Sequence, residues 1–305
     1  YEIDGVKGYY NGKYSSDNSY KPLPTGFTGA GPGGRALVIA GEGDDVDQEF
    51  SLVKNIRAVS NSEYGVRCFA ANTKGVKNVH FESMFIANNG HPSGTYGDFV
   101  VADSFGVDFL INSDVTGESE NITWNNVNIT RALGYGTPLS VDGFNHEQQN
   151  VKITLIGDAL YELTACQLFG AKEFKSTNLK SSGSKQHYSF GATCENVELV
   201  EDRAYDCKKF MLSHPTGDNN IIRQGRAYHS AAVAVSGENG VTVGDYGVVY
   251  EDMLFDGFHR AVINDSSNVT FDNVKTVNSV VLGLVDNESE LDGAHFKNCD
   301  FDSAN

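Results

Sequence analysis

The chain has 305 residues, of which 40% are hydrophobic, and it contains 33 glycines but only six prolines. This apolar content is enough for a continuous core and excludes a globally disordered chain. The formal net charge of −17, without a long basic run, argues against nucleic acid and anionic membranes as partners. No segment approaches the roughly 20 apolar residues of a membrane-spanning helix.

The first 35 residues form no periodic pattern, and their tyrosines lie among Gly, Ser and Pro. The chain becomes periodic from about residue 36, so we predict an irregular segment over 1–35 and a repetitive part over 36–305. An array of repeats exposes strand edges and core at its first unit. We therefore expect the N-terminal segment to cap this end or to wrap along its side.

In the repetitive part, a motif recurs in which Asn is followed by Val or Ile, then any residue, then usually a hydrophobic one. The copies begin at Asn55, Asn78, Asn121, Asn150, Asn196, Asn220 and Asn268, with gaps of 23, 43, 29, 46, 24 and 48 residues. These gaps are one or two units of about 23 residues, one of them enlarged, and Asn239-Gly-Val-Thr-Val fills most of the last double gap. A short period built on β-branched residues predicts a solenoid whose units bury their apolar sides against one another.

Each unit also contains a second apolar strand that ends in a small or polar residue. These strands are expected at 167–171, 188–192, 210–214, 232–236, 261–265 and 282–286. In the motif strands, alternation places Val79 and Phe81 inside and His80 outside. The same alternation places the single tryptophan, Trp124, in the core, although a sugar-stacking role is the alternative.

The repeated asparagines have a structural explanation, because Asn tolerates the left-handed backbone conformation of a tight turn. Asparagines stacked in successive coils can also bond amide to amide. The glycosylation sequons then follow from the turn and strand pattern itself; they lie at Asn121, Asn128, Asn264, Asn268 and Asn287. The five cysteines include no CxxC pair, so we expect buried free thiols.

Three segments interrupt the repeat, around residues 89–97, 112–120 and 131–149. Loops inserted into a solenoid project from one face and often shape its binding surface. We therefore expect the functional surface between Asn78 and Asn150.

The Asn-Val-X-Phe strands, the period of about 23 residues and the polar turns resemble the right-handed parallel β-helix of the pectin-lyase-like superfamily, over about residues 36–301. The resemblance implies an all-β, single-stranded β-helix. The superfamily contains pectate lyases, polygalacturonases, epimerases, phage tailspike depolymerases and non-catalytic adhesins, so the fold alone names no reaction. The acidic, Gly- and Asn-rich composition is most similar to phage tailspikes. That similarity implies a homotrimer on a virion or otherwise extracellular surface, with a cell-surface polysaccharide as partner.

The polygalacturonase motifs are poorly matched in this chain. Of the Asn-Thr-Asp, Asp-Asp and Gly-His-Gly motifs, Ser140-Val-Asp-Gly only echoes the first, Asp44-Asp45 lies too early, and no Gly-His-Gly occurs. A polygalacturonase activity is therefore not expected.

A hydrolytic site is predicted from carboxylates on neighbouring coils. Glycoside hydrolysis needs two carboxyl groups roughly 5 Å or roughly 6.5 to 9.5 Å apart, and equivalent positions on adjacent coils are about 4.8 Å apart. Asp103 and Asp142 both follow an apolar strand, and His146 and Glu147 lie beside Asp142, so we predict that these four residues form the catalytic group. We predict Glu147 or Asp142 as general acid and Asp103 as partner base. The alternative is that Asp103 and Asp142 only cap turns.

Substrate-binding residues are predicted in two places. Tyr96 and Tyr135 in the loops can stack on sugar rings. A cationic cluster can bind sugar carboxylates through its arginines; it comprises His187, His214, Asp218, Arg223, Arg226 and His229. Ordinary solvated coil surface is the alternative explanation for this cluster.

The leading hypothesis is thus a tailspike-like depolymerase that hydrolyses a polysaccharide without a cofactor. A non-catalytic adhesin is the main alternative. A third hypothesis is a lyase that uses an arginine base with calcium. Asp44, Asp45, Asp47 and Glu49 are the candidate calcium ligands, and solvated surface charge is their alternative explanation.

Overall fold

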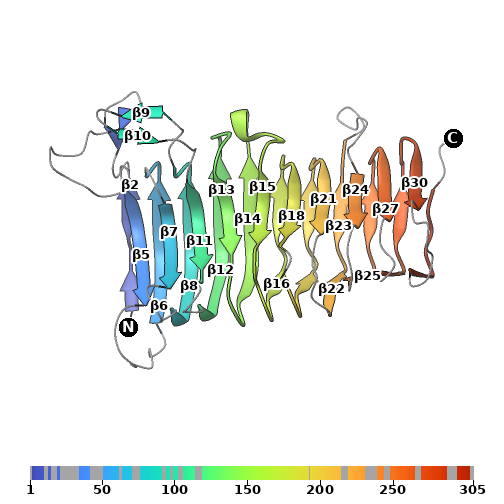
Figure 1. Cartoon of the computed structure of the whole chain (residues 1–305), viewed down its shortest axis with the longest axis horizontal. Coiled ribbons are helices and arrows are strands. Elements are labelled where there is room, and N and C mark those ends of the chain that lie inside the picture. Colours follow the sequence, from blue (N-terminus) through green and yellow to red (C-terminus); the bar gives the residue numbers. More distant parts are fainter. Residues whose placement is uncertain are drawn as a thin grey trace.

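The computed structural model describes residues 2–9, 13–14, 19–20, 34–41, 51–61, 64–70, 76–90, 94–96, 99–101, 106–113, 119–191, 193–213, 219–230, 239–243, 248–264, 269–286 and 294–302. These residues form β-strands, with one short 3-10 helix at Gly157–Ala159. The strands lie side by side along an elongated molecule, with the chain termini at opposite ends (Figure 1). No helix in these ranges is long and apolar enough to cross a membrane.

Two sheets extend along the molecule. The ten-stranded sheet consists of β5 (Arg35–Gly41), β7 (Tyr64–Ala70), β11 (Val107–Asn112), β13 (Thr137–Val141), β15 (Thr164–Leu168), β18 (Gln186–Phe190), β21 (Lys209–Ser213), β24 (Asn239–Val243), β27 (Arg260–Asn264) and β30 (Leu282–Asp286). The seventeen-stranded sheet begins with β1 (Glu2–Asp4), β2 (Lys7–Tyr9), β6 (Ser51–Val59), β8 (Lys77–Ala87), β12 (Glu120–Arg131) and β14 (Glu147–Leu155). It continues with β16 (Lys175–Thr177), β17 (Lys180–Ser182), β19 (Glu198–Val200), β20 (Arg203–Tyr205), β22 (Asn220–Arg223), β23 (Arg226–Tyr228), β25 (Val248–Glu251), β26 (Leu254–Asp256), β28 (Val269–Asp272), β29 (Lys275–Val277) and β31 (His295–Lys297).

Within both sheets, each strand pairs in parallel with the corresponding strand of the next coil. A coil contributes one strand to the ten-stranded sheet, then one long strand or two short strands to the seventeen-stranded sheet. Parallel neighbours from successive coils are the defining feature of a β-solenoid. The predicted all-β parallel β-helix is confirmed.

The coil lengths differ from the predicted count. Lys77 lies beside Glu120, so that coil has 43 residues, whereas the coil from Glu120 to Phe144 has 24. The gap of 43 residues was predicted to be two units but is one coil with additional residues. Asn239 lies in β24 beside Arg260, in the ten-stranded sheet, so it is not a further copy of the motif. The strand predicted at 232–236 lies outside the described residues.

The N-terminal segment is more regular than predicted. β1 and β2 both pair in parallel with β6, so residues 2–9 add a partial coil to the first edge of the seventeen-stranded sheet. Main-chain groups of that edge are thereby hydrogen-bonded, which protects it from pairing with other chains. Further along this segment, β3 (Lys13–Tyr14) and β4 (Ser19–Tyr20) form a small antiparallel pair.

The three segments that were predicted to be loop insertions have different structures. Around 89–97, β9 (Gly94–Tyr96) and β10 (Phe99–Val101) form an antiparallel pair, which projects from the N-terminal half of the molecule (Figure 1). Within 112–120, residues 114–118 lie outside the described residues. The range 131–149 is not a loop insertion, because it contains β13 and the beginning of β14.

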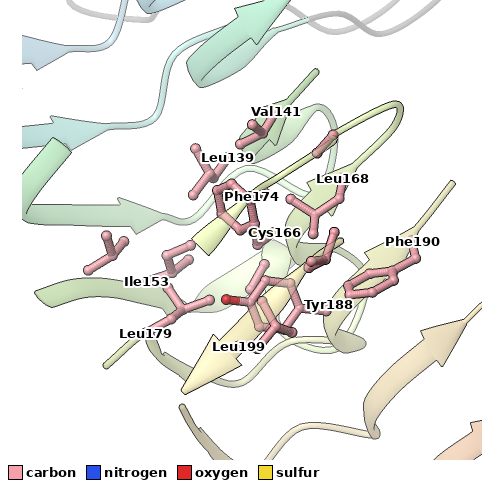
Figure 2. Packing of buried hydrophobic residues seen from close by; sticks show 14 of the residues in the cluster. Leu139, Val141, Ile153, Cys166, Leu168, Phe174, Leu179, Tyr188, Phe190 and Leu199 are labelled. Carbon is pink, nitrogen blue, oxygen red and sulfur yellow. The ribbon is translucent and has the colours of Figure 1, made fainter. Parts of the chain in front are cut away.

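The core follows the predicted alternation. Val79 and Phe81 are buried and His80 faces outward, and Trp124 is buried as expected. Successive coils place apolar side chains over one another, as Figure 2 shows for the middle of the molecule. Burial of each large side chain contributes roughly 1.5–3 kcal/mol, which is how short strands are held together. All five cysteines are free, and all but Cys299 are buried.

The left-handed asparagines of the motif that the structure describes lie in two columns of turns. Asn78 and Asn121 belong to one column, where the amide of Asn121 donates to the side-chain oxygen of Asn78 at 2.7 Å. Asn150 belongs to the other, and the amide of Asn178 donates to its side-chain oxygen at 2.7 Å. The predicted left-handed conformation and amide bonding are therefore confirmed at these positions. Asn220 differs, because the left-handed residue there is Asn219.

Candidate functional site

The turn after β13 contains three of the predicted catalytic residues. Asp142 is partly buried, and its backbone N–H donates to the carbonyl of Ile111 at 2.9 Å. On its other side, a Cβ atom added to Gly170 would lie 2.5 Å from Oδ1 of Asp142. The carboxylate of Asp142 is therefore packed closely against the backbone of the next coil.

His146 fixes this turn and does not face solvent. The backbone N–H of Ile122 donates to its Nδ1 at 3.1 Å, so Nε2 carries the proton and donates to the carbonyl of Asp142 at 3.3 Å. Burial lowers the pKa of His146 to about 4, so the ring is neutral near pH 7. The predicted catalytic role of His146 is wrong, because its ring is enclosed and both nitrogens serve the turn.

The register gives Asp142 a different neighbour from the predicted one. Val141 lies beside Ile111, so the residue equivalent to Asp142 on the preceding coil is Asn112. Asp103 lies outside the described residues, before the strand that contains Asn112. The predicted equivalence of Asp103 and Asp142 is wrong, because the coil of 43 residues shifts the alignment that the repeat count assumed.

Glu147 begins β14 and faces outward from the seventeen-stranded sheet. It lies between Thr123 and Lys175 in register and accepts a hydrogen bond from the amide of Gln149 at 2.7 Å. Asp142 and Glu147 thus lie at the two ends of one short turn and are both partly exposed. Both predicted catalytic carboxylates that lie within the described residues are therefore accessible to solvent.

The predicted cationic cluster is not a single surface. His187 is buried between Tyr188 and Phe210, with ring centroids 4.8 and 5.0 Å away. Its Nδ1 is 2.6 Å from the hydroxyl of Ser181, and burial lowers its pKa to about 3. His187 is thus a core residue, and the prediction that it binds substrate is wrong. Arg226 is exposed on β23.

The other members of that cluster are distributed differently. His214 and Asp218 lie outside the described residues. Arg223 forms an ion pair with Glu198 on the neighbouring strand, and the buried ring of His229 contacts Phe258. Only Arg223 and Arg226 of the described members face outward.

The two predicted sugar-stacking tyrosines have different positions. Tyr96 lies in β9. The carbonyl of Tyr135 accepts hydrogen bonds from the guanidinium of Arg131, whose carbon lies 5.9 Å from the centre of the Tyr135 ring. The same guanidinium forms a fully buried ion pair of 2.8 Å with Asp108. Tyr135 is therefore part of a packed corner, although its side chain is partly exposed.

A buried polar network around Gln148 was not predicted from the sequence. The indole of Trp124 donates to Gln148 at 3.1 Å, and the amide of Gln148 donates to the hydroxyl of Ser176 at 2.8 Å. The hydroxyl of Tyr188 donates to the carboxyl group of Asp202 at 2.8 Å. Burial raises the pKa of Asp202 to about 7. Because ligands cannot reach this network, it specifies the packing of four coils rather than a reaction.

Among the described residues, the most exposed aromatic pair lies in the regular part of the molecule, not between Asn78 and Asn150. Tyr205 on β20 and Tyr228 on β23 are 41% and 45% exposed and lie side by side in register. The sequence contains a signal for them, because the tripeptide Arg-Ala-Tyr occurs at 203–205 and again 23 residues later at 226–228. A tripeptide repeated at the coil period places both copies on one face.

A calcium site finds no support within the described ranges, where no three His, Cys, Asp or Glu side chains gather. The predicted acidic loop of Asp44, Asp45, Asp47 and Glu49 lies outside them.

Comparison with known proteins finds a distant structural likeness. No family model matches the sequence, and no curated protein matches it. A polygalacturonase from Erwinia carotovora ssp. carotovora is similar over 87% of this chain and 92% of its own, at 12% identity and a TM-score of 0.46. A likeness this distant says nothing of the activity of this chain. The strand pairing itself defines the fold.

Proposed function

We propose that this chain binds an extended polysaccharide along the outer face of its seventeen-stranded sheet. The observation that carries the proposal is the exposed pair Tyr205 and Tyr228. A tyrosine ring offers a flat apolar face with a polar hydroxyl at its edge, which suits the apolar faces and hydroxyl groups of a sugar. Adjacent strands hold the two rings with a spacing of about 4.8 Å between backbones. A ligand that repeats along its own axis can use such a face better than a compact one.

The test replaces both tyrosines with alanine and measures binding to a panel of soluble polysaccharides by affinity electrophoresis. Phe169 provides a matched control, because it is 57% exposed but belongs to the turn after β15, on the ten-stranded sheet. The double variant should bind about ten-fold more weakly or worse, equivalent to about 1.4 kcal/mol, while Phe169→Ala binds normally. Equal binding by the double variant would contradict the proposal.

Glycosidic hydrolysis at Asp142 and Glu147 is the second candidate function. It is favoured by the partial exposure of both carboxylates at the two ends of the turn that His146 holds. In this scheme, one carboxyl group protonates the leaving oxygen and the other activates water or attacks the sugar. Asp142→Asn and Glu147→Gln should then abolish the release of reducing ends without loss of binding. Unsaturated products that absorb near 232 nm would instead indicate a lyase, and binding without products would indicate an adhesin.

The tailspike-like assembly is also part of this proposal. A homotrimer on a virion or other extracellular surface would present three such faces to a cell-surface glycan, and multivalent contact strengthens weak binding. Sedimentation equilibrium of the chain measures the assembly directly. A monomer at all concentrations tested would refute the trimer without affecting the polysaccharide proposal.

A further inference from the structure

Four cations stand in one line on the outer face of the seventeen-stranded sheet. Lys152 on β14 pairs in register with Lys180 on β17, Lys180 with Arg203 on β20, and Arg203 with Arg226 on β23. We call these four residues the cation ladder. With about 4.8 Å between strands, it extends over roughly 14 Å. Asn128 precedes it and Leu254 follows it in the same register, so the ladder has defined ends.

The cation ladder is unexpected in a chain with a formal net charge of −17. Like charges directly opposite each other on adjacent strands destabilise a sheet. Elsewhere the same sheet places an acid beside a cation, as in the ion pairs Lys77–Glu120 at 2.6 Å and Lys297–Asp272 at 2.7 Å. None of the four ladder residues forms an ion pair with any residue that the structure describes.

The surroundings of the ladder show how a ligand would meet it. Tyr205 and Tyr228 lie two residues after Arg203 and Arg226, on the same outer face of β20 and β23. The cations and the rings therefore form two parallel rows. Glu201 is exposed two residues before Arg203, and Asp206 accepts a hydrogen bond from the backbone of Ser230 at 2.8 Å. Asp256 follows Tyr228 in register on β26 and ends the row of rings. These three acids flank the rows and do not separate the cations from one another.

We infer that the polysaccharide bound on this face is anionic, with carboxylate or sulfate groups along its length. The inference rests on the proposed function and adds the class of ligand. Arginine binds such groups through two parallel hydrogen bonds, and lysine binds them as a point charge. A row of cations at constant spacing fits a linear polyanion, and the adjacent tyrosine pair contacts the sugar rings. The net charge of −17 repels any polyanion, and the repulsion grows with charge density, so it opposes nucleic acid more than a polysaccharide with fewer charges per sugar.

The experiment compares polymers that differ only in charge. Binding is measured by affinity electrophoresis with alginate and dextran sulfate, and with carboxyl-reduced alginate and dextran as their neutral counterparts. The ladder variant carries Arg203→Gln and Arg226→Gln. Its matched control carries Lys172→Gln and Lys185→Gln, two exposed lysines outside the ladder. Both variants remove the same charge, so a difference between them reports position rather than net charge.

We expect at least one anionic polymer to bind the unchanged chain more tightly than its neutral counterpart, and this preference to weaken as salt rises. The ladder variant should lose about ten-fold or more in affinity for that polymer, while the control variant stays within about two-fold. Neutral polymers should bind both variants equally, because they do not use the charges.

Four results would overturn the inference. Tyrosine-dependent binding of neutral and anionic polymers with equal affinity would refute the anionic class but leave the proposed function intact. Binding of no polymer would refute both. Preferential, ladder-dependent binding of single-stranded DNA would assign the face to nucleic acid. Ladder substitutions that dissociate an oligomer without changing polymer binding would assign it to contact between copies of this chain.

Discussion

Replacing Asp202 with asparagine tests whether the core contains a carboxyl group that titrates near neutrality. Burial raises the pKa of Asp202 from 3.8 to about 7. The unfolded chain therefore releases this proton at lower pH than the folded protein does, so stability falls as pH rises through this window. Each pH unit is worth about 1.4 kcal/mol. The full window thus amounts to at most about 4 kcal/mol, reached at about pH 7.

The assay is urea unfolding of both proteins, followed by circular dichroism, between about pH 4 and about pH 8. Asparagine cannot ionise, and its oxygen can still accept the hydrogen bond that the backbone of Leu179 donates to Asp202 at 2.7 Å. The stability of Asp202→Asn relative to the unchanged chain should therefore increase up to about pH 7 and then remain constant. His146 and His187 oppose this trend in each protein and cancel in the difference. A difference independent of pH would refute the argument.

Three further substitutions have expected outcomes. Arg131→Met leaves Asp108 buried without its partner and should cost about 3–5 kcal/mol in urea unfolding; a cost below about 1 kcal/mol would show that water reaches this corner. Gly191→Ala places a Cβ atom 2.3 Å from the backbone carbonyl oxygen of Phe169 and should lower stability by about 1–3 kcal/mol, which an unchanged melting temperature would contradict. Arg203→Gln relieves repulsion in the cation ladder and should stabilise the chain by about 0.2–1 kcal/mol at low salt, with the gain disappearing at high salt. A loss of stability at low salt would mean that the guanidinium has a structural partner.

The fold could be predicted because its determinants are local. A left-handed turn needs Asn or Gly whatever the distant sequence is, and alternation identifies the inward side of each strand. The register could not be predicted from the same motif. Asn78 and Asn55 both have left-handed backbone conformations, yet they belong to different turn columns of the coil. The number of residues between two motif copies therefore depends both on the length of a coil and on which turn column each copy occupies.

The neighbours of the candidate site residues could not be predicted for the same reason. The neighbour of Asp142 depends on the number of residues in the preceding coil, and one coil of 43 residues makes that neighbour Asn112. The position of His187 likewise depends on a turn whose length no periodicity specifies. The repeated tripeptides that end at Tyr205 and Tyr228 needed no such count, because two identical copies one coil apart must face the same way.

The fold explains the stacked asparagines but not the stacked cations. An amide carries both donor and acceptor, so a column such as Asn150 and Asn178 satisfies itself, and the solenoid alone accounts for it. A column of cations has donors only and repels itself. Arg203 and Arg226 therefore lower the stability of the sheet slightly, and no interaction among the described residues compensates for this loss. Selection can remove such a cost by a single substitution. Four cations in register are therefore better explained by an anion that lies across them.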